Sequence, residues 1–286
     1  MTNHFDSSFV NTNGIRLHTI QAGPADGKPV ILLHGFPEFW RGWQKQIYPL
    51  ANDGYRVIVP DQRGYNLSDK PKGIGAYRLN ELIRDVVGLI RASGHEKAAV
   101  VGHDWGGVVA WWLAIHYPHR LSRMGVLNAP HPSIMAKNLL TNPSQILRST
   151  YALFFQIPGL PEAIARYNDW QIVVEGLEKS SRPGTFTDED FEYYRQAWWR
   201  KNAFTSMLNW YRAGARRTAH MPRDPRVRVP TLVLWGAEDV ALGRELVQPS
   251  VDLCDNGRLT MFEDATHWVQ HEEVEAVTNT LLDFLG

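Results

Sequence analysis

The chain of 286 residues balances 30 lysine and arginine residues against 30 aspartate and glutamate residues. With 44% hydrophobic and 21% charged residues, it has the composition of a globular protein with a large core. The balanced charge gives no strong overall field to attract nucleic acid or an anionic membrane. No apolar run approaches the roughly 20 residues of a membrane helix. We therefore expect neither nucleic-acid binding nor membrane insertion.

The N-terminus and the cysteine content bear on the compartment. The first ten residues, MTNHFDSSFV, lack a basic start followed by an apolar stretch, so no signal peptide is predicted. The single cysteine, Cys254, cannot form an internal disulfide. A cytoplasmic location is therefore the default expectation. We expect the protein to be either a monomer or a homodimer. The 11 tryptophans and 10 tyrosines fit a large aromatic core or an aromatic-lined apolar pocket.

Short β-rich runs alternate with helical stretches over most of the chain. This alternation predicts an α/β fold, a mostly parallel central sheet flanked by helices. The first two strands flank the turn signal Thr12-Asn13-Gly14, which predicts a hairpin. The predicted strands span residues 9–11, 15–20, 30–33, 56–59, 98–101, 124–127, 231–235 and 258–262. The predicted helices span residues 79–92, 106–117 and 274–285.

The middle of the chain differs from both ends. From about Ser133 to His220 the strand pattern disappears, and the segment is rich in aromatic residues, arginines and helix formers. This pattern predicts a helical insertion between two halves of the sheet domain. The predicted domains are a core of residues 1–132 and 221–286 and a helical cap of residues 133–220.

The strongest local signal is VVGHDWGG, which runs from Val100 to Gly107. It begins as a strand and ends as the start of a helix rich in small residues. A Gly-x-nucleophile-x-Gly turn strains the backbone at its centre and needs small neighbours, which Gly102 and Gly106 supply. Asp104 occupies the nucleophile position. The alternative is that Asp104 only caps the following helix.

A second signal, LLHGFPEFW, follows an apolar strand. The turn at His34 to Pro37 frees the backbone N–H of Phe36, and the N–H of Trp105 follows the candidate nucleophile. Together these two groups would form an oxyanion hole. Without the first motif, this segment is an ordinary turn at the end of a strand.

Two later segments supply a candidate base and acid. His267, in DATHWVQ, follows a strand and precedes the last helix, and Asp239, in LWGAEDVAL, follows the previous strand. Glu238 and Asp264 compete with Asp239 for the acid role. Asn128 stands at the end of the preceding strand, where some hydrolases place the acid, and this favours Asp239. No histidine, cysteine and acidic spacing supports a metal site.

The order Asp104, Asp239, His267 along the chain, with HGFP upstream, resembles the α/β-hydrolase superfamily over nearly the whole length. An aspartate nucleophile narrows the resemblance to epoxide hydrolases and dehalogenases. Soluble epoxide hydrolases carry two lid tyrosines, one before Phe-Gln-x-Pro-Gly and one in Asn-Trp-Tyr-Arg. This sequence has both segments, and the resemblance assigns the two acids to Tyr151 and Tyr211. It also implies a substrate pocket that includes His34, Pro37 and Trp210.

The resemblance implies an epoxide hydrolase that needs no metal or organic cofactor. A carboxylate is ionised at neutral pH, so Asp104 can attack an epoxide carbon of a small apolar substrate without a base. Water activated by His267 and Asp239 would then hydrolyse the ester and release a vicinal diol. The alternatives are a haloalkane or haloacid dehalogenase with the same nucleophile, and a catalytically silent binding protein on the same fold. The aspartate at position 104 disfavours a serine esterase.

Overall fold

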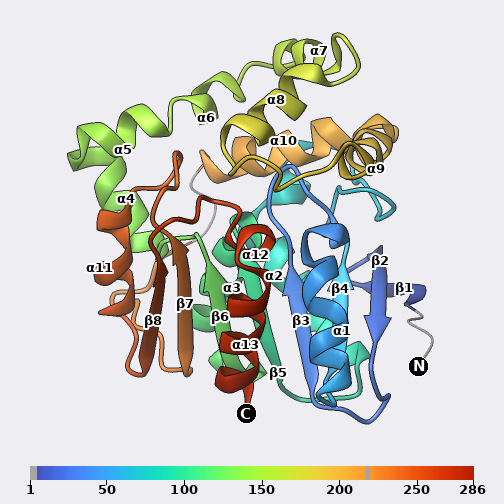
Figure 1. Cartoon of the computed structure of the whole chain (residues 1–286), viewed down its shortest axis with the longest axis vertical. Helices are drawn as coiled ribbons and strands as arrows, with labels where there is room; N and C mark the ends of the chain where they lie inside the picture. Colours follow the sequence, from blue (N-terminus) through green and yellow to red (C-terminus); the bar gives the residue numbers. More distant parts are fainter. Residues whose placement is uncertain (1–4, 217–219) are drawn as a thin grey trace.

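The computed structural model describes residues 5–216 and 220–286. Residues 1–4 of the predicted core and residues 217–219 of the predicted cap lie outside the described part. An eight-stranded sheet with the order β1-β2-β4-β3-β5-β6-β7-β8 forms the centre of the molecule (Figure 1). The strands are β1 (Asp6–Thr12), β2 (Ile15–Ala22), β3 (Pro29–Leu33), β4 (Arg56–Pro60), β5 (Ala98–His103), β6 (Leu121–Leu127), β7 (Thr231–Gly236) and β8 (Gly257–Phe262).

The sheet is parallel except at its first edge. β2 pairs antiparallel with both β1 and β4, and the remaining neighbours run parallel. The predicted hairpin is confirmed, and its turn places Asn13 (φ 46°) and Gly14 (φ 75°) in the left-handed region. Two such residues are what a tight turn with the twist of a hairpin requires. The predicted α/β fold with a mostly parallel sheet is therefore confirmed.

Helices cover both faces of the sheet because its central strands are apolar on both sides. In β3, Ile31 and Leu33 pack into one core, whereas Val30 and Leu32 pack into the other. The first core lies against α2 (Leu79–Ala92) and α3 (Trp105–His116), and the second against α1 (Gln44–Asn52) and α13 (Val274–Leu285). Continuous apolar runs are typical of parallel strands buried on both faces. The two short helices α11 (Val247–Val251) and α12 (Val269–Glu272) complete the set around the sheet.

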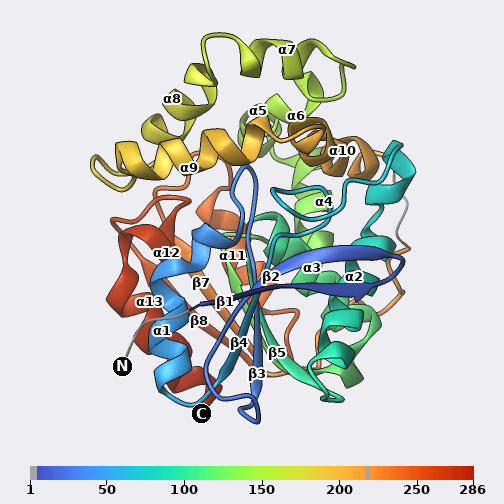
Figure 2. The same ribbon diagram turned by 90° about the vertical axis from the view of Figure 1, so that its right-hand side faces the viewer.

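The middle of the chain forms a layer of helices above the carboxyl ends of the strands (Figures 1 and 2). We call it the helical layer, and it contains no strand between residues 132 and 214. Its helices are α4 (Pro132–Thr141), α5 (Pro143–Arg148), α6 (Tyr151–Phe154), α7 (Leu160–Arg166), α8 (Gln171–Lys179), α9 (Asp188–Trp199) and α10 (Ala203–Gly214). In the described part of the chain, no helix combines the length and the apolar character required to cross a bilayer.

Candidate active site

Asp104 lies on a strained turn between β5 and α3. Its backbone has φ 50° and ψ −119°, a conformation that residues with a side chain rarely adopt. The flanking positions accept only glycine, since a Cβ on Gly102 would lie 2.2 Å from the Gly106 carbonyl oxygen. A Cβ on Gly35 would lie 2.4 Å from the Cβ of Asp104. The Asp104 side chain makes no capping hydrogen bond to α3, so the capping hypothesis is wrong.

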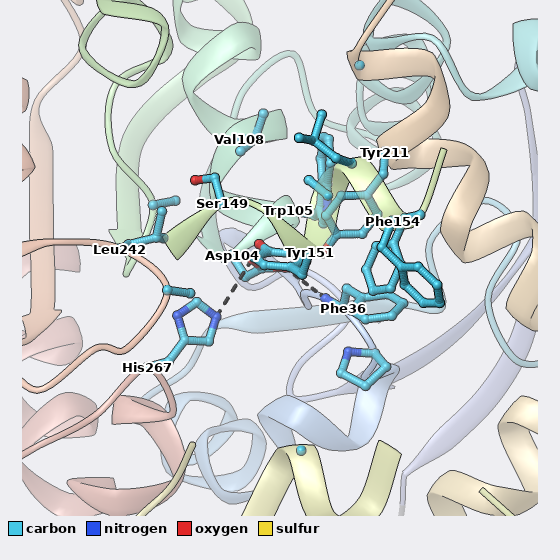
Figure 3. A pocket seen from close by; sticks show the side chains of 18 of the residues that line it. Phe36, Asp104, Trp105, Val108, Ser149, Tyr151, Phe154, Tyr211, Leu242 and His267 are labelled. Carbon is cyan, nitrogen blue, oxygen red and sulfur yellow. Dashed lines mark hydrogen bonds and ion pairs between the residues drawn. The ribbon is translucent and has the colours of Figure 1, made fainter. Parts of the chain in front are cut away.

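The Asp104 carboxylate lies between a backbone donor and an imidazole (Figure 3). Its Oδ1 accepts a 2.8 Å hydrogen bond from the N–H of Phe36, the donor expected from the HGFP turn. Its Oδ2 lies 3.6 Å from His267 Nε2. Trp105 is the first residue of α3, where backbone N–H groups have no partner within the helix. The arrangement therefore leaves Oδ2 as the carboxylate oxygen that is not held by a backbone donor.

His267 is oriented by Asp239 and not by either competitor. Its Nδ1 lies 2.7 Å from Asp239 Oδ2, and the Asp239 side chain is fully buried. The Asp239 carboxylate also accepts hydrogen bonds from the backbone N–H groups of residues 241 and 242 and from Asn128 Nδ2 at 2.8 Å. Glu238 and Asp264 are exposed. Asn128, which directly follows β6, thus donates a hydrogen bond to Asp239, the acid in the loop after β7.

Charge sets the protonation of this histidine. Burial by itself lowers the pKa of His267, but the Asp239 carboxylate, with a smaller contribution from Asp104, outweighs burial and raises it to about 9. For Asp239, burial raises the pKa, but the His267 charge and hydrogen bond, together with Asn128, leave it below its usual range. Asp239 is therefore ionised, and His267 carries a proton at neutral pH while Asp104 is charged.

A buried acid that the sequence did not single out lies behind the histidine. The Glu38 side chain is fully buried, accepts hydrogen bonds from Tyr194 and Gln270, and lies 2.6 Å from His271 Nε2. It also lies 3.3 Å from Nδ1 of His103, whose Nε2 lies 2.8 Å from the backbone oxygen of His267. Burial raises the pKa of Glu38, yet the neighbouring histidines hold it well below its usual range. Glu38 and His103 thus fix the loop that carries His267, and His103 points away from the cavity.

A cavity of about 940 Å³ lies between the sheet and the helical layer. Asp104, His267 and Phe36 line its floor, and Tyr151 and Tyr211 face it from α6 and α10. Most of the other lining side chains are apolar, including Pro37, as the sequence predicted. Such a cavity fits an apolar small molecule whose reacting atoms sit beside Asp104.

The structure corrects two of the predicted pocket residues. His34 and Trp210 are both buried and are not among the residues that line the cavity. His34 Nε2 accepts the backbone N–H of Gln62 at 3.0 Å, and Trp210 Nε1 donates to the carbonyl of Arg63 at 3.0 Å. Both side chains therefore turn toward residues 61–71, the loop that follows β4, and tie this loop to β3 and α10.

The two tyrosines lie together above Asp104. Their ring centroids are 6.0 Å apart, and Tyr211 packs edge-on against the Trp105 ring at 5.0 Å. Tyr211 is 9% exposed, whereas Tyr151 keeps 41% of its surface because it faces the open cavity. Burial, together with the nearby Asp104 charge, raises the pKa of both hydroxyls. Both tyrosines therefore remain protonated and able to donate a hydrogen bond.

No three histidine, cysteine or acidic side chains in residues 5–216 and 220–286 are grouped so that they could hold a metal ion. The polar groups that face the cavity are the carboxylate, the imidazole, the two phenols and the backbone N–H groups. They lie above the carboxyl edge of the sheet, where open α/β sheets place their ligands.

Comparisons with known proteins identify the family of the chain. The family model of the alpha/beta hydrolase fold matches residues 28–274. The AB hydrolase superfamily protein YfhM of Bacillus subtilis (strain 168) is 47% identical over 277 residues, which are 97% of this chain and 96% of that protein. Epoxide hydrolase 1 of Caenorhabditis elegans is 37% identical over 99% of this chain and 70% of its own length.

Solved structures of epoxide hydrolases are also similar to this chain. The crystal structure of epoxide hydrolase A from Mycobacterium thermoresistibile superposes with a TM-score of 0.87 at 31% identity, covering 99% of this chain and 98% of that one. This superposition includes both the sheet and the helical layer, because it covers almost the whole of both chains. The chain therefore belongs to the α/β-hydrolase fold family, in the branch of that family that contains the epoxide hydrolases.

Proposed function

We propose that this protein converts an apolar epoxide to a vicinal diol through a covalent ester at Asp104. The observation that carries the proposal is the position of the Asp104 carboxylate. It lies 3.6 Å from a histidine held by a buried acid, in an apolar cavity that two protonated tyrosines also face. The helical layer supplies both tyrosines and would act as the cap over the reacting atoms.

In the first step, Oδ2 of Asp104 attacks an epoxide carbon from the side opposite the ring oxygen. The C–O bond of the ring breaks, and its electron pair goes to the oxygen. The hydroxyls of Tyr151 and Tyr211 stabilise this oxygen by hydrogen bonding, and one of them transfers its proton to it. The Phe36 N–H holds Oδ1 and leaves Oδ2 free to react.

In the second step, water hydrolyses the ester. His267 removes a proton from the water, and the oxygen attacks Cγ of Asp104. Negative charge develops on Oδ1, where the N–H groups of Phe36 and Trp105 stabilise it. Losing one such donor typically costs about 2.7–4 kcal/mol. The bond from Cγ to the original Oδ2 then breaks, and protonated His267 gives its proton to this oxygen, which leaves in the diol. The second proton of the water passes from the new carboxyl group to the phenolate formed in the first step.

Oxygen labelling tests this sequence of bonds. With enzyme in excess over a racemic styrene-type epoxide in heavy-oxygen water, the first diol should carry no heavy oxygen, because its new oxygen comes from Asp104. A peptide containing Asp104 should instead gain the label. With substrate in excess, later diols should become labelled. Heavy oxygen in the first diol would show direct attack by water and overturn the covalent mechanism.

Dehalogenation is the second candidate, since the Trp105 side chain lines the cavity beside Asp104. An indole N–H can hold a departing halide, and the same ester chemistry would follow. The two phenols favour an oxygen leaving group, which needs a proton. Haloalkane and epoxide substrates with the same carbon skeleton separate the two activities. Faster halide release than diol formation would replace the epoxide hydrolase proposal.

A further inference from the structure

Exposed apolar side chains are concentrated on one part of the surface. Of the sixteen large apolar residues exposed in the described part of the chain, eleven lie between Leu139 and Ile172, on α4 to α8. Besides Tyr151, five of these line the cavity: Leu139, Ile146, Leu153, Ile164 and Ile172. The other five, which we call the outer set, do not line it: Leu140, Leu147, Ile157, Leu160 and Tyr167. An exposed apolar area of this kind marks a site of interaction.

The outer set follows the arch that α4, α5, α6 and α7 form over the sheet (Figures 1 and 2). Leu140, Leu147 and Tyr167 are 73%, 72% and 80% exposed, so their side chains reach into solvent. The cavity opens along the same helices, since Leu153, which lines it, is itself 72% exposed. The outer set and the mouth of the cavity therefore lie on the same stretch of helices.

The charge on this arch has one sign. No aspartate or glutamate occurs between Asp104 and Glu162, and the buried Glu162 pairs with Arg212. Lys137 and Arg166 are exposed and form no ion pair with any residue that the structure describes, whereas Arg148, also exposed, donates a 2.7 Å hydrogen bond to the backbone carbonyl of Asp239. The other acidic residues of the helical layer are Asp169, which follows α7 and lies 3.6 Å from Arg195 of α9, and Glu175, Glu178, Asp188, Glu189, Asp190 and Glu192 of α8 and α9. The zero net charge of the chain thus conceals a cationic, apolar arch.

We propose that α4 to α7 dock on an anionic lipid surface, with the outer set in the interface and Lys137 and Arg166 against the lipid headgroups. Apolar side chains combined with lysine and arginine are the combination that binds proteins to the surface of a bilayer without spanning it. A second copy of the chain fits this face less well. Symmetric pairing would bring Lys137 and Arg166 toward their own copies, and the one acid on α4 to α7, Glu162, is buried against Arg212.

If the protein docks in this orientation, the substrate would reach the cavity from the bilayer. An apolar epoxide partitions into the bilayer, and the mouth of the cavity would face that bilayer rather than bulk water. The substrate could then pass from the lipid to Asp104 along the apolar lining. This consequence rests on the proposed function, whereas the docking itself does not.

Vesicle sedimentation tests the docking with the full chain and no epoxide present. The probes are vesicles of phosphatidylcholine alone and of phosphatidylcholine with phosphatidylglycerol. The wild type should sediment with the anionic vesicles and be released by added salt. The variant with Leu140→Ser, Leu147→Ser and Tyr167→Ser should lose at least about fivefold in bound fraction. The variant with Lys137→Glu and Arg166→Glu should show a similar loss.

Matched controls change the same residue types elsewhere. Phe9→Ser with Leu67→Ser removes exposed apolar groups away from the arch, and Arg91→Glu with Lys97→Glu makes the same change in charge. Both controls should bind like the wild type, and all variants should turn over a water-soluble epoxide normally without vesicles. Wild type that stays in the supernatant, or an outer-set variant that still binds, would overturn the proposal. A dimer in light scattering that this variant dissociates, without vesicle binding, would also overturn it.

The outcome is independent of the proposed function. The Asp104→Asn variant should bind vesicles like the wild type, because Asp104 lies inside the cavity. Vesicle binding without any diol formation would remove the enzymatic proposal and keep the docking. Diol formation without vesicle binding would do the reverse.

Discussion

The charge on His267 depends on the state of Asp104. With both carboxylates ionised, the pKa of His267 is about 9, so the imidazole is protonated at neutral pH and cannot act as a base. In the proposed mechanism, formation of the ester would remove the Asp104 charge, which is one of the groups that raise this pKa. The pKa of His267 would therefore fall when the intermediate forms. The histidine would become a competent base at the step where water must be deprotonated.

This change predicts different pH profiles for the two steps. Ester hydrolysis should accelerate as pH rises through the pKa of His267 in the intermediate, which lies below its value of about 9 in the free protein. Ester formation should depend less on pH than ester hydrolysis, because the attack of a carboxylate on the epoxide needs no base. Stopped-flow tryptophan fluorescence resolves the two phases. A hydrolysis rate that does not change with pH would contradict the role of His267 as base.

Replacing the two phenols tests the ring-opening step. The variant with Tyr151→Phe and Tyr211→Phe should lose about 10²–10³-fold or more in the rate of ester formation, since each hydroxyl donates to the developing alkoxide. Binding of a diol product should weaken far less, because the rings still line the cavity. Tyr167→Phe, an exposed residue of the same layer, is the matched control. Full activity in the double variant would remove the tyrosines from the mechanism.

At the scale of the elements, the position of Asp104 depends on how closely α3 approaches β3. A Cβ on Gly106 would lie 2.2 Å from the Leu33 carbonyl oxygen, and backbone cannot move aside as a flexible side chain can. Gly176, on α8, has no atom within 4 Å of its would-be Cβ. The two glycines therefore have opposite effects on stability. Gly106 allows α3 to pack closely on β3, whereas Gly176 only lowers the stability of α8.

Alanine substitutions at these two positions should change stability in opposite directions. Gly106→Ala should lower the free energy of unfolding by about 1–3 kcal/mol or more and abolish turnover, because α3 must move together with Asp104. Gly176→Ala should raise it by about 0.4–1 kcal/mol. Urea denaturation followed by tryptophan fluorescence measures both. Gly106→Ala with wild-type stability and activity would contradict the packing argument.

At the scale of the whole molecule, one buried ion pair links the segments that carry the two tyrosines. Arg212, next to Tyr211, pairs with Glu162 of α7 at 2.8 Å. Its guanidinium also donates to the carbonyl oxygens of Phe155 and Ile157, which follow α6 and Tyr151. Burial raises the pKa of Glu162, but Arg212 outweighs burial and leaves it below its usual range. The pair therefore stays charged and holds α6, α7 and α10 in one arrangement.

Removing one partner should be worse than removing both. Arg212→Met should cost about 3–5 kcal/mol, since it leaves the Glu162 charge buried without a partner. Combining Arg212→Met with Glu162→Met should recover part of that loss, while the two carbonyl contacts stay broken. Chemical denaturation gives the three stabilities, and ester formation reports on the tyrosines. Equal stability of the single and double variants would show that the pair does not hold the layer.

The strained turn that carries Asp104 was predictable because its signal is local. A strand, a strained turn and a helix within eight residues need small side chains at fixed positions, and Gly102, Asp104 and Gly106 satisfy this need wherever the rest of the chain lies. The strands and the helical middle were predictable from periodicity for the same reason. α2 and α13 coincide with the predicted ranges 79–92 and 274–285, and α3 begins one residue earlier than predicted.

The sequence also predicted that Asp104, Asp239 and His267 lie near one another, because parallel strands bring their carboxyl ends to the same edge of the sheet. Tertiary packing decided the rest. Only the buried position of Asp239 separates it from exposed Glu238, and only distant partners turn His34 and Trp210 away from the cavity. Glu38 gave no local signal, because its role comes from histidines 65 and 233 positions away. Backbone conformation is encoded by near neighbours, whereas the direction and charge of a buried side chain depend on atoms that only the fold brings together.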